Sequence, residues 1–267
     1  MTVAEALAGL RRRLGDAGVP TPDVDAELLV RHVLGWSRGQ LLTCATQLLD
    51  EDAAAGLARL AQRRAAREPL QLLVGSVGFR HLELAVRPGV FIPRPETEVL
   101  AGWAVAHTPP GGVVVEPCTG SGAVACAVAS EVPGCTVVAT DNSSEAVALA
   151  RDNAARAGVT VDVRQGDLLD PVPGTLRGRV DVLVSNPPYL ATAELAGLEP
   201  EVVDWDPRQA LVSGPGGAEV TSRLVTAAPA WLAGGGWLLL EVDPSRAAIT
   251  AAAMAAQQLV DVCVLHD

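Results

Sequence analysis

The segment Val180–Ser185 constrains the fold most, because all of it except Asp181 and its final serine is apolar and it is followed closely by two prolines. A short, largely β-branched run of this kind is typical of a strand that is buried on both faces of a parallel sheet. Pro187 and Pro188 cannot continue a hydrogen-bonded ladder, and Pro187 also holds the preceding residue, Asn186, in an extended conformation. We therefore expect a central strand that ends at Asn186.

Strand and helix patterns alternate along the chain after residue 111. The pattern predicts further strands at 112–115, 136–140, 159–163, 237–242 and 260–265, and helices at 124–130, 143–157 and 246–256. Such alternation is typical of parallel sheets whose crossover connections are helices. The sequence thus predicts an α/β fold with a Rossmann-like, doubly wound sheet, and such sheets bind ligands at the carboxyl ends of their strands.

The first 70 residues have a different, helical pattern. Thr2 and Glu5 have the spacing of a capping box before a run with the apolar spacing of a helix. Thr21 followed by Pro22 marks the start of a second helix, and Asp50 marks that of a long later one. We predict a small helical bundle here. Because it contains no catalytic constellation, we expect it to serve in substrate recognition.

Residues 71–95 are interpreted as a hairpin and a linker. Apolar residues first alternate as in a β-hairpin. The sequence Phe-Ile-Pro-Arg-Pro-Glu-Thr-Glu follows, in which two prolines bracket Arg94, and a helix capped at Thr97 begins. Two interpretations are open for this segment: a rigid linker, or a wall of a pocket to which Arg94 contributes. Residues 96–267 form the remaining, larger domain. Within it, the long connection at 191–230 is too long to be a simple turn and is expected to be functional.

The charge pattern argues against a polyphosphate partner. All 20 basic residues are arginine, so chemistries that need a lysine, such as Schiff-base formation or a P-loop, are excluded. The first 75 residues are neutral overall, with nine arginines and nine acids, whereas the rest of the chain carries the whole formal charge of −11. Basic residues supply most of the non-specific affinity for nucleic acid, so we expect no direct nucleic-acid partner.

The five cysteines form no ligand pattern. They are scattered, without a Cys-x-x-Cys pair or a histidine at ligand spacing, so we expect neither a disulfide framework nor a metal site. The sequence has no uninterrupted apolar run of about 18 residues, and its first residues lack a basic signal-peptide segment. We therefore expect a cytoplasmic protein without a membrane partner.

A glycine-rich turn follows the first strand of the expected sheet. Its residues, in the sequence Glu-Pro-Cys-Thr-Gly-Ser-Gly, include Thr119, Gly120, Ser121 and Gly122. The glycines let backbone amides approach a ligand closely beside the start of a helix. Asp141 lies 21 residues after Gly120, about the spacing at which an acid binds two ribose hydroxyls. The same turn also satisfies the dinucleotide-binding fingerprint, and a tight turn without a ligand is a further alternative.

The four residues Asn-Pro-Pro-Tyr after the central strand combine a polar amide, stiff backbone carbonyls and an aromatic ring. This set suits a planar NH2 group, because the side-chain oxygen of Asn186 can accept one N–H and the carbonyl of Pro187 the other. Tyr189 can cover the π-face of such a group. The simpler interpretation is an Asn-Pro turn that leaves a strand, with a packed tyrosine.

Together these motifs resemble a known family. Four of them occur in the order typical of class I S-adenosylmethionine-dependent methyltransferases: Glu116-x-x-Thr-Gly-Ser-Gly, Asp141, Gly166-Asp167 and Asn186-Pro-Pro-Tyr189. Three further features are similar to one branch, the protein-(glutamine-N5) methyltransferases of peptide-chain release factors. They are the proline-bracketed segment around Arg94, Pro69-Leu-Gln and the helical amino terminus. The likeness extends from residue 5 to the end of the chain.

The resemblance implies an activity and a cofactor. The enzyme would transfer a methyl group from S-adenosyl-L-methionine to the side-chain amide nitrogen of the glutamine in a Gly-Gly-Gln motif, leaving S-adenosyl-L-homocysteine. Asp141 would hold the ribose, and the turn from Thr119 to Gly122 would pack on the methionine part. Leu168, the residue after Asp167, would flank adenine, and Asp167 and Asn186 would also contribute to cofactor binding.

The resemblance also implies how a class I release factor is bound. The catalytic candidates are Asn186, Pro187 and Tyr189, and the glutamine would lie among these residues and Pro188. Arg94 is a further substrate-binding candidate. The helical domain would hold the body of the release factor, and we expect the enzyme to act as a monomer.

Three features depart from the family's pattern. Pro117-Cys118 stands where the family usually has Leu-Gly, and the segment after Pro69 lacks the usual tyrosine. The sequence ends at Asp267, where the family normally adds another strand. We expect Cys118 to narrow one backbone approach to the cofactor.

Four other functions remain as alternatives. A DNA or RNA amino-methyltransferase would share Asn-Pro-Pro-Tyr but should have a basic surface. An oxidoreductase that binds a nicotinamide dinucleotide would share the glycine turn and leave the proline motif unexplained. A non-catalytic interaction protein would explain the helical bundle alone, and an amino-methyltransferase that acts on another protein is a further alternative.

Overall fold

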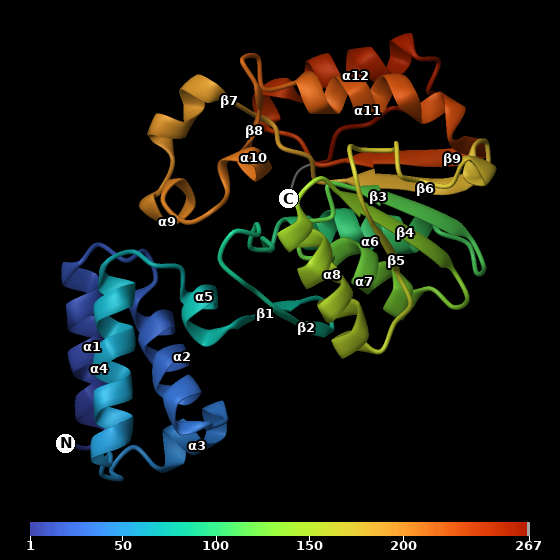
Figure 1. Cartoon of the computed structure of the whole chain (residues 1–267). Coiled ribbons are helices and arrows are strands. Elements are labelled where there is room, and N and C mark those ends of the chain that lie inside the picture. Colours follow the sequence, from blue (N-terminus) through green and yellow to red (C-terminus); the bar gives the residue numbers. More distant parts are fainter. Residues whose placement is uncertain (266–267) are drawn as a thin grey trace. The chain divides into compact units, whose positions relative to one another are not determined.

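A computed structural model describes residues 1–265, and the chain divides into two compact units, Met1–Gly75 and Ser76–Asp267 (Figure 1). The first unit is helical, and the second contains the sheet and the predicted site. The boundary follows the short helix α5 (Leu70–Val74), whose Leu73 packs in the core of the first unit. The sequence predicts a first domain of residues 1–70, which ends at the first residue of this helix.

The helices of the first unit begin where the sequence predicted. They are α1 (Val3–Asp16), α2 (Pro22–Leu34), α3 (Arg38–Thr43) and α4 (Glu51–Ala65), followed by α5. Thr2 and Glu5 form both bonds of the capping box, at 2.8 and 3.2 Å, and Asp50 caps α4. Thr21 is the N-cap residue of α2 and is followed by Pro22, as predicted, but its side chain makes no capping bond and its hydroxyl donates to the Asp25 carboxylate at 2.8 Å. The predicted bundle is confirmed, and its role in recognition stays a prediction.

Among the described residues, five strands of the second unit form one parallel sheet. In chain order they are β3 (Val113–Pro117), β4 (Thr136–Asp141), β5 (Asp162–Gln165), β6 (Val180–Ser185) and β9 (Leu232–Leu240). Their order in the sheet is β5-β4-β3-β6-β9, so the chain extends outward from β3 in one direction and later continues from β6 in the other. This topology confirms the predicted doubly wound α/β sheet and puts its switch point between β3 and β6.

Helices cover both faces of this sheet (Figure 1). One face is covered by α6 (Thr97–His107), α7 (Ala123–Glu131) and α8 (Ser144–Ala157), and the other by α11 (Glu219–Ala227), against which α12 (Ala247–Ala256) packs. Val114 and Val182 pack in the first core, whereas their neighbours Val115 and Leu183 pack in the second. Alternate residues of a strand point to opposite faces. Burial on both faces therefore explains the apolar runs in the sequence.

Asn153 of α8 connects a β-hairpin to the glycine-rich turn. The predicted hairpin consists of β1 (Ser76–Phe79) and β2 (Leu82–Ala85), which pair antiparallel. Asn153 is fully buried, and its side chain accepts a hydrogen bond from the Ala85 amide at 2.8 Å. It also donates to the carbonyls of Ala85 and Ser121, at 3.1 and 2.9 Å. One side chain thus satisfies three buried backbone groups.

We expect Asn153→Ala to lower the free energy of unfolding by about 2 kcal/mol, because it leaves these backbone groups buried without partners. Chemical denaturation measures the loss. Asp152→Ala is the matched control, since Asp152 lies on the same helix but pairs with Arg87 at the surface. The control should change stability by less than about 0.5 kcal/mol. Equal losses in the two variants would contradict the role given to Asn153.

Before it reaches α11, the long connection between β6 and β9 consists of short elements. They are β7 (Leu190–Ala191), a 3-10 helix at Thr192–Gly197, α9 (Pro200–Val203), α10 (Arg208–Leu211) and β8 (Val212–Gly214). β7 and β8 pair with each other in parallel. The connection therefore has ordered local structure, which allows it to form a wall beside the sheet.

Three predicted strands differ from the structure. Residues 260–265 form no strand, so this prediction was wrong. An apolar pattern is not sufficient for a strand, because a strand also needs a neighbouring strand to pair with. This segment pairs with none of the described strands. The strand predicted at 159–163 begins later, because the amide of residue 159 still bonds to the end of α8. β9 begins earlier, because Leu232 already pairs with Val180, and the register shifts before Trp237 pairs with Val182. A Cβ at Gly236 would lie 2.7 Å from the Val180 carbonyl oxygen.

Candidate active site

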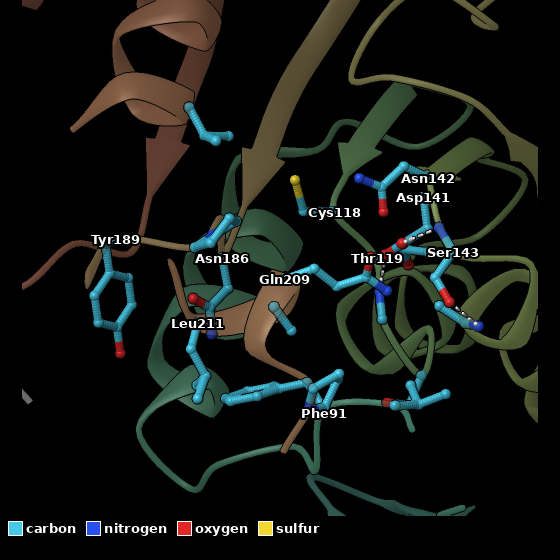
Figure 2. A pocket seen from close by; sticks show the side chains of 18 of the residues that line it. Phe91, Cys118, Thr119, Asp141, Asn142, Ser143, Asn186, Tyr189, Gln209 and Leu211 are labelled. Carbon is cyan, nitrogen blue, oxygen red and sulfur yellow. Dashed lines mark hydrogen bonds between the residues drawn. The ribbon is translucent and has the colours of Figure 1, made fainter. Parts of the chain in front are cut away.

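One cavity lies at the carboxyl ends of four neighbouring strands. It has a volume of about 570 Å³ and is lined by residues that follow β3, β4, β5 and β6, around the switch point of the sheet. Figure 2 shows Asp141 at one end of it and Asn186 with Tyr189 at the other. The residues predicted for the cofactor and for the substrate therefore share one space, whose size is typical of a small-molecule site.

Most of the predicted site residues line this cavity. They are Arg94, Thr119, Gly120, Ser121, Asp141, Asp167, Leu168, Asn186, Pro188 and Tyr189. Gly122 and Pro187 are not among the lining residues. Gly122 has φ +81° and packs against α8, where a Cβ would lie 3.0 Å from that of Ala150. Pro187 is buried between two residues that do line the cavity.

A buried carboxyl holds the glycine turn. The Thr119 hydroxyl and the Ala125 amide both donate to the same oxygen of Glu116, at 2.7 and 2.9 Å. Burial raises the pKa of Glu116 from 4.5 to about 8, against the opposing effect of these two bonds. Glu116 is therefore mostly protonated at neutral pH, and it connects the end of β3 to the start of α7.

This raised pKa predicts a pH dependence of stability. In the unfolded chain Glu116 ionises near pH 4.5, whereas in the folded protein it stays protonated up to about pH 8, so its contribution to stability falls as the pH rises across that window. Glu116→Gln cannot ionise and keeps an acceptor for both donors. We expect the melting temperature of the variant, relative to the wild type, to rise between pH 5 and 8 and then to level off.

Glu145→Gln is the control for this comparison. The Glu145 carboxylate is exposed, and hydrogen bonds to the backbone and to neighbouring serines lower its pKa, so its removal should have no increasing effect above pH 5. Parallel melting profiles for Glu116→Gln and the wild type would contradict the assignment.

Cys118 has a backbone conformation that normally favours glycine. Its φ is +60°, in the left-handed region, where a side chain is strained. This explains why the family that the chain resembles usually has glycine here. Figure 2 shows the Cys118 side chain in the cavity between Asn186 and Asp141, as expected from the sequence. Burial raises the pKa of its thiol to about 12, so the thiol stays protonated.

Asp141 is held in place by two backbone amides. Its two carboxylate oxygens accept hydrogen bonds from Gly120 at 2.9 Å and from Ser143 at 3.0 Å. Each carboxylate oxygen can accept a further bond, and Asp141 lines the cavity. Burial raises the pKa of this carboxyl, opposed by the amide bonds. At Gly120, a Cβ would meet nothing within 4 Å, so the space in front of the turn is open.

Asp167 and Leu168 lie on the same side of the cavity, after β5. Leu168 has φ +45°, and its carbonyl accepts the Thr140 hydroxyl at 2.5 Å, which holds the turn against β4. Asp167 forms a two-bonded ion pair with Arg223 of α11, at 3.3 and 2.5 Å. Arg223 also lines the cavity and was not predicted.

At the other end of the cavity, a hydrogen bond holds the side chain of Asn186. Its side-chain nitrogen donates to the hydroxyl of Thr97, the first residue of α6, at 3.1 Å. Asn186 is half-buried and lines the cavity together with Thr97. The sequence predicted that Thr97 caps α6, but the cap residue is Glu96 and the Thr97 hydroxyl bonds to Asn186 instead.

Tyr189 provides a neutral aromatic wall. Burial, together with the negative charges of Glu241 and Asp243, raises the pKa of its phenol to about 12. The phenol is therefore not a base at neutral pH. The residue lines the cavity on the same side as Asn186 (Figure 2), and its role in covering a planar group stays a prediction.

The segment around Arg94 has features of both predicted alternatives, a rigid linker and a wall of a pocket. Arg94 lines the cavity, and it forms an ion pair with Asp206, whose side chain is completely buried. The same carboxylate accepts the Ile92 amide at 3.4 Å, and the Arg94 guanidinium lies 4.9 Å from the centre of the Phe91 ring. The proline-rich segment is thus fastened to the connection between β6 and β9, which forms the opposite wall.

Sequence reasoning missed several lining residues. They include Phe91, Asn142, Ser143, Gln209, Leu211, Arg223 and Asp243. Asn142 and Asp243 follow closely after the ends of β4 and β9, so the rule for strand ends could have identified them. Gln209 lies in the connection that was expected to be functional but belongs to no motif.

Within residues 1–265, no group of His, Cys, Asp or Glu side chains could hold a metal ion. In the same part of the chain, no helix is long and apolar enough to cross a membrane.

Comparison with known proteins defines the class. Two family models match, the PrmC N-terminal domain over residues 5–75 and the Methyltransferase small domain over residues 88–199. Among solved structures, ribosomal protein L11 methylase from Lactobacillus delbrueckii subsp. bulgaricus is similar in fold. Its TM-score is 0.51, with 20% identity, covering 72% of this chain and 93% of that one. With the observed sheet topology, these matches define a methyltransferase of the class I fold.

Sequence relatives define the family within that class. Release factor glutamine methyltransferases of Mycolicibacterium smegmatis and Streptomyces coelicolor are 45% and 44% identical, over 95% and 88% of this chain and 89% and 83% of theirs. The one of Deinococcus radiodurans is 42% identical, over 94% of this chain and 90% of its own. The chain belongs to the release factor glutamine methyltransferases, as the resemblance of its motifs indicated. The nucleic-acid and nicotinamide alternatives are not favoured.

Proposed function

We propose that this enzyme transfers the methyl group of S-adenosyl-L-methionine to the side-chain amide nitrogen of the glutamine in the Gly-Gly-Gln motif of peptide-chain release factors. The names of its relatives support the reaction and the substrate. The observation that carries the proposal is that Asp141 and the tethered Asn186 line one cavity. A ribose-binding acid and an acceptor for an amide N–H then face the same space.

The described residues fit this cofactor. Asp141 is held by two amides and has acceptor positions left for two ribose hydroxyls. The space in front of Gly120 is open for the methionine part, and Leu168 offers an apolar surface for adenine. Bound S-adenosyl-L-methionine supplies an activated sulfonium methyl group. The protein therefore needs mainly to hold the acceptor nitrogen in line with that group.

The residues after β6 would hold the acceptor. An amide nitrogen is a poor nucleophile because its lone pair is delocalised. Two hydrogen bonds, to the side-chain oxygen of Asn186 and the carbonyl of Pro187, would orient it and would strengthen as positive charge develops on nitrogen. Tyr189 stays neutral and covers the amide plane. No strong base is needed before transfer, because the nitrogen loses its proton afterwards.

The first unit would bind the body of the release factor. It matches the PrmC N-terminal domain over residues 5–75, and its sequence contains no catalytic constellation. We further propose that the enzyme acts as a monomer in the cytoplasm and does not contact nucleic acid directly. The formal charge of −11, carried entirely by the rest of the chain, supports the last point.

Mass spectrometry tests the proposed function. A purified class I release factor is incubated with the enzyme and S-adenosyl-L-methionine, digested and sequenced by fragmentation. The expected result is one added methyl group on the glutamine of Gly-Gly-Gln. A release factor that stays unmodified, or a methyl group on another residue, would contradict the proposal. A release factor with Gly-Gly-Glu at the motif is the control and should gain no methyl group.

A further inference from the structure

The hydrogen bond between Asn186 and Thr97 joins two parts of the chain that are 89 residues apart. Thr97 is 5% exposed and lies at the start of α6, which carries Ala101 and Ala104 in the main core. Its amide donates to the Arg94 carbonyl at 3.2 Å. The Thr97 hydroxyl is therefore held by a packed helix and by the fastened proline-rich segment, rather than by the segment that carries Asn186.

The two ends of the Asn186 carboxamide are chemically opposite. The oxygen accepts hydrogen bonds, and the nitrogen only donates them. A substrate NH2 group brings two donors, so it can bind to the oxygen but is repelled by the nitrogen. An asparagine that rotated freely about its last side-chain bond would present the wrong end for part of the time.

We propose that Thr97 is a positioning residue that orients Asn186 for methyl transfer. By accepting a bond from the side-chain nitrogen, Thr97 turns the oxygen of Asn186 toward the cavity, where the substrate amide must bind. This inference rests on the proposed function, because it concerns the same acceptor site. It adds a residue of the proline-rich segment to that site and gives the segment a role in catalysis that acts through Asn186.

The backbone on both sides of Asn186 is fixed, so the bond to Thr97 determines the orientation of the Asn186 side chain. Ser185 is fixed, since its hydroxyl donates to the Pro117 carbonyl at 2.7 Å, and Pro187 is buried. The backbone of Asn186 is thus held on both sides, and the rotation of its side chain is the freedom that remains. Thr97 restricts that rotation from outside the strand.

Thr97→Val tests the proposal, because valine keeps the shape of threonine and removes the hydroxyl. We expect kcat for the release factor to fall about tenfold, which corresponds to the loss of about one hydrogen bond. KM and the dissociation constant for S-adenosyl-L-methionine should change less than about threefold, because Thr97 contributes to the orientation of the acceptor rather than to binding. Thr97→Ser keeps the hydroxyl and should recover most of the activity.

Thr108→Val is the matched control. Thr108 is also buried, at the other end of α6, and its hydroxyl donates to the Ala104 carbonyl at 2.6 Å. It does not line the cavity. This variant loses one buried hydroxyl of the same helix and should keep kcat, even if its melting temperature falls as much as that of Thr97→Val. An equal fall of kcat in both would assign Thr97 a merely structural role and overturn the proposal.

A double-mutant cycle distinguishes action through Asn186 from direct action. In an Asn186→Ala background, Thr97→Val should cause no further loss, because there is no carboxamide left to orient. Full additivity of the two losses would overturn the proposal.

Nuclear magnetic resonance gives a readout that does not depend on activity. The side-chain NH2 signals of Asn186, assigned by their loss in Asn186→Ala, should shift in Thr97→Val and stay unchanged in Thr108→Val. If the wild type methylates no release factor, the proposed function fails. The NH2 signals of Asn186 still test whether Thr97 positions its side chain. If they do not shift in Thr97→Val, the positioning role of Thr97 is overturned. If the wild type is active and Thr97→Val has full kcat, the positioning alone fails.

Discussion

Asn186→Ala should lower kcat for the release factor by roughly 100–1000-fold, which corresponds to about 3–4 kcal/mol of transition-state stabilisation. The side-chain oxygen of Asn186 would hold one amide proton more tightly as positive charge develops on nitrogen, so its loss affects the transition state more than the bound substrate. KM and cofactor affinity should change much less. Steady-state kinetics with a purified release factor, together with calorimetry of S-adenosyl-L-methionine binding, measures both effects.

Asn186→Asp provides the sharper comparison. It keeps an acceptor, and a carboxylate would favour a cationic nitrogen. Burial next to Pro187, however, costs desolvation and should raise the pKa of the new carboxyl above its usual range. We expect partial activity that increases with pH as the carboxyl ionises. Near-normal kcat in Asn186→Ala would mean that Asn-Pro-Pro-Tyr is only a turn, and the proposed chemistry would lose its main residue.

Asp141→Ala should weaken S-adenosyl-L-methionine binding by about 100-fold. The carboxylate would accept two ribose hydroxyls, and a hydrogen bond to a charged group contributes roughly 1.5–3 kcal/mol. Since tenfold in affinity corresponds to about 1.4 kcal/mol, the loss of both bonds predicts at least this effect. The variant also loses the acceptor that holds the amides of Gly120 and Ser143, which loosens the turn. Calorimetry measures the dissociation constant directly.

Two control variants separate the ribose contact of Asp141 from a general effect of charge. Asp162→Ala removes the same charge from the exposed end of the neighbouring strand, where Asp162 pairs with Arg164, and should leave affinity unchanged. Asp141→Asn keeps an acceptor without the charge and should give an intermediate affinity. Unchanged binding in Asp141→Ala, or tighter binding of NAD than of S-adenosyl-L-methionine by the wild type, would refute the assignment of Asp141 to the ribose of this cofactor.

Local signals in the sequence were sufficient to predict the main helices, strands and turns. Thr2 and Glu5 predicted a capping box that the structure contains, because a helix start depends on side chains only three residues apart. The apolar run Val180–Ser185 predicted a strand buried on both faces, and Pro187 predicted where it ends. The glycine turn and Asp141 could be recognised because turn geometry and strand ends are also determined by neighbouring residues.

The same local signals failed where a partner was needed. Residues 260–265 have a strand pattern but pair with no described strand, and Thr21 begins α2 but its hydroxyl bonds to Asp25 rather than capping the helix. In each case the local pattern indicates which structure or hydrogen bond is possible, whereas the available partners determine which one forms.

The sequence by itself determined the class of fold, the turn that approaches the cofactor and the residues Asn186 to Tyr189. Only the tertiary structure decided which of these residues meet. β3 pairs with β6 rather than only with its neighbour in sequence, and this brings the glycine turn beside Asn186. The ion pair of Arg94 with Asp206 spans 112 residues, and the bond from Asn186 to Thr97 spans 89. Such contacts depend on how strands and helices pack against one another, and no local spacing in the sequence records that packing.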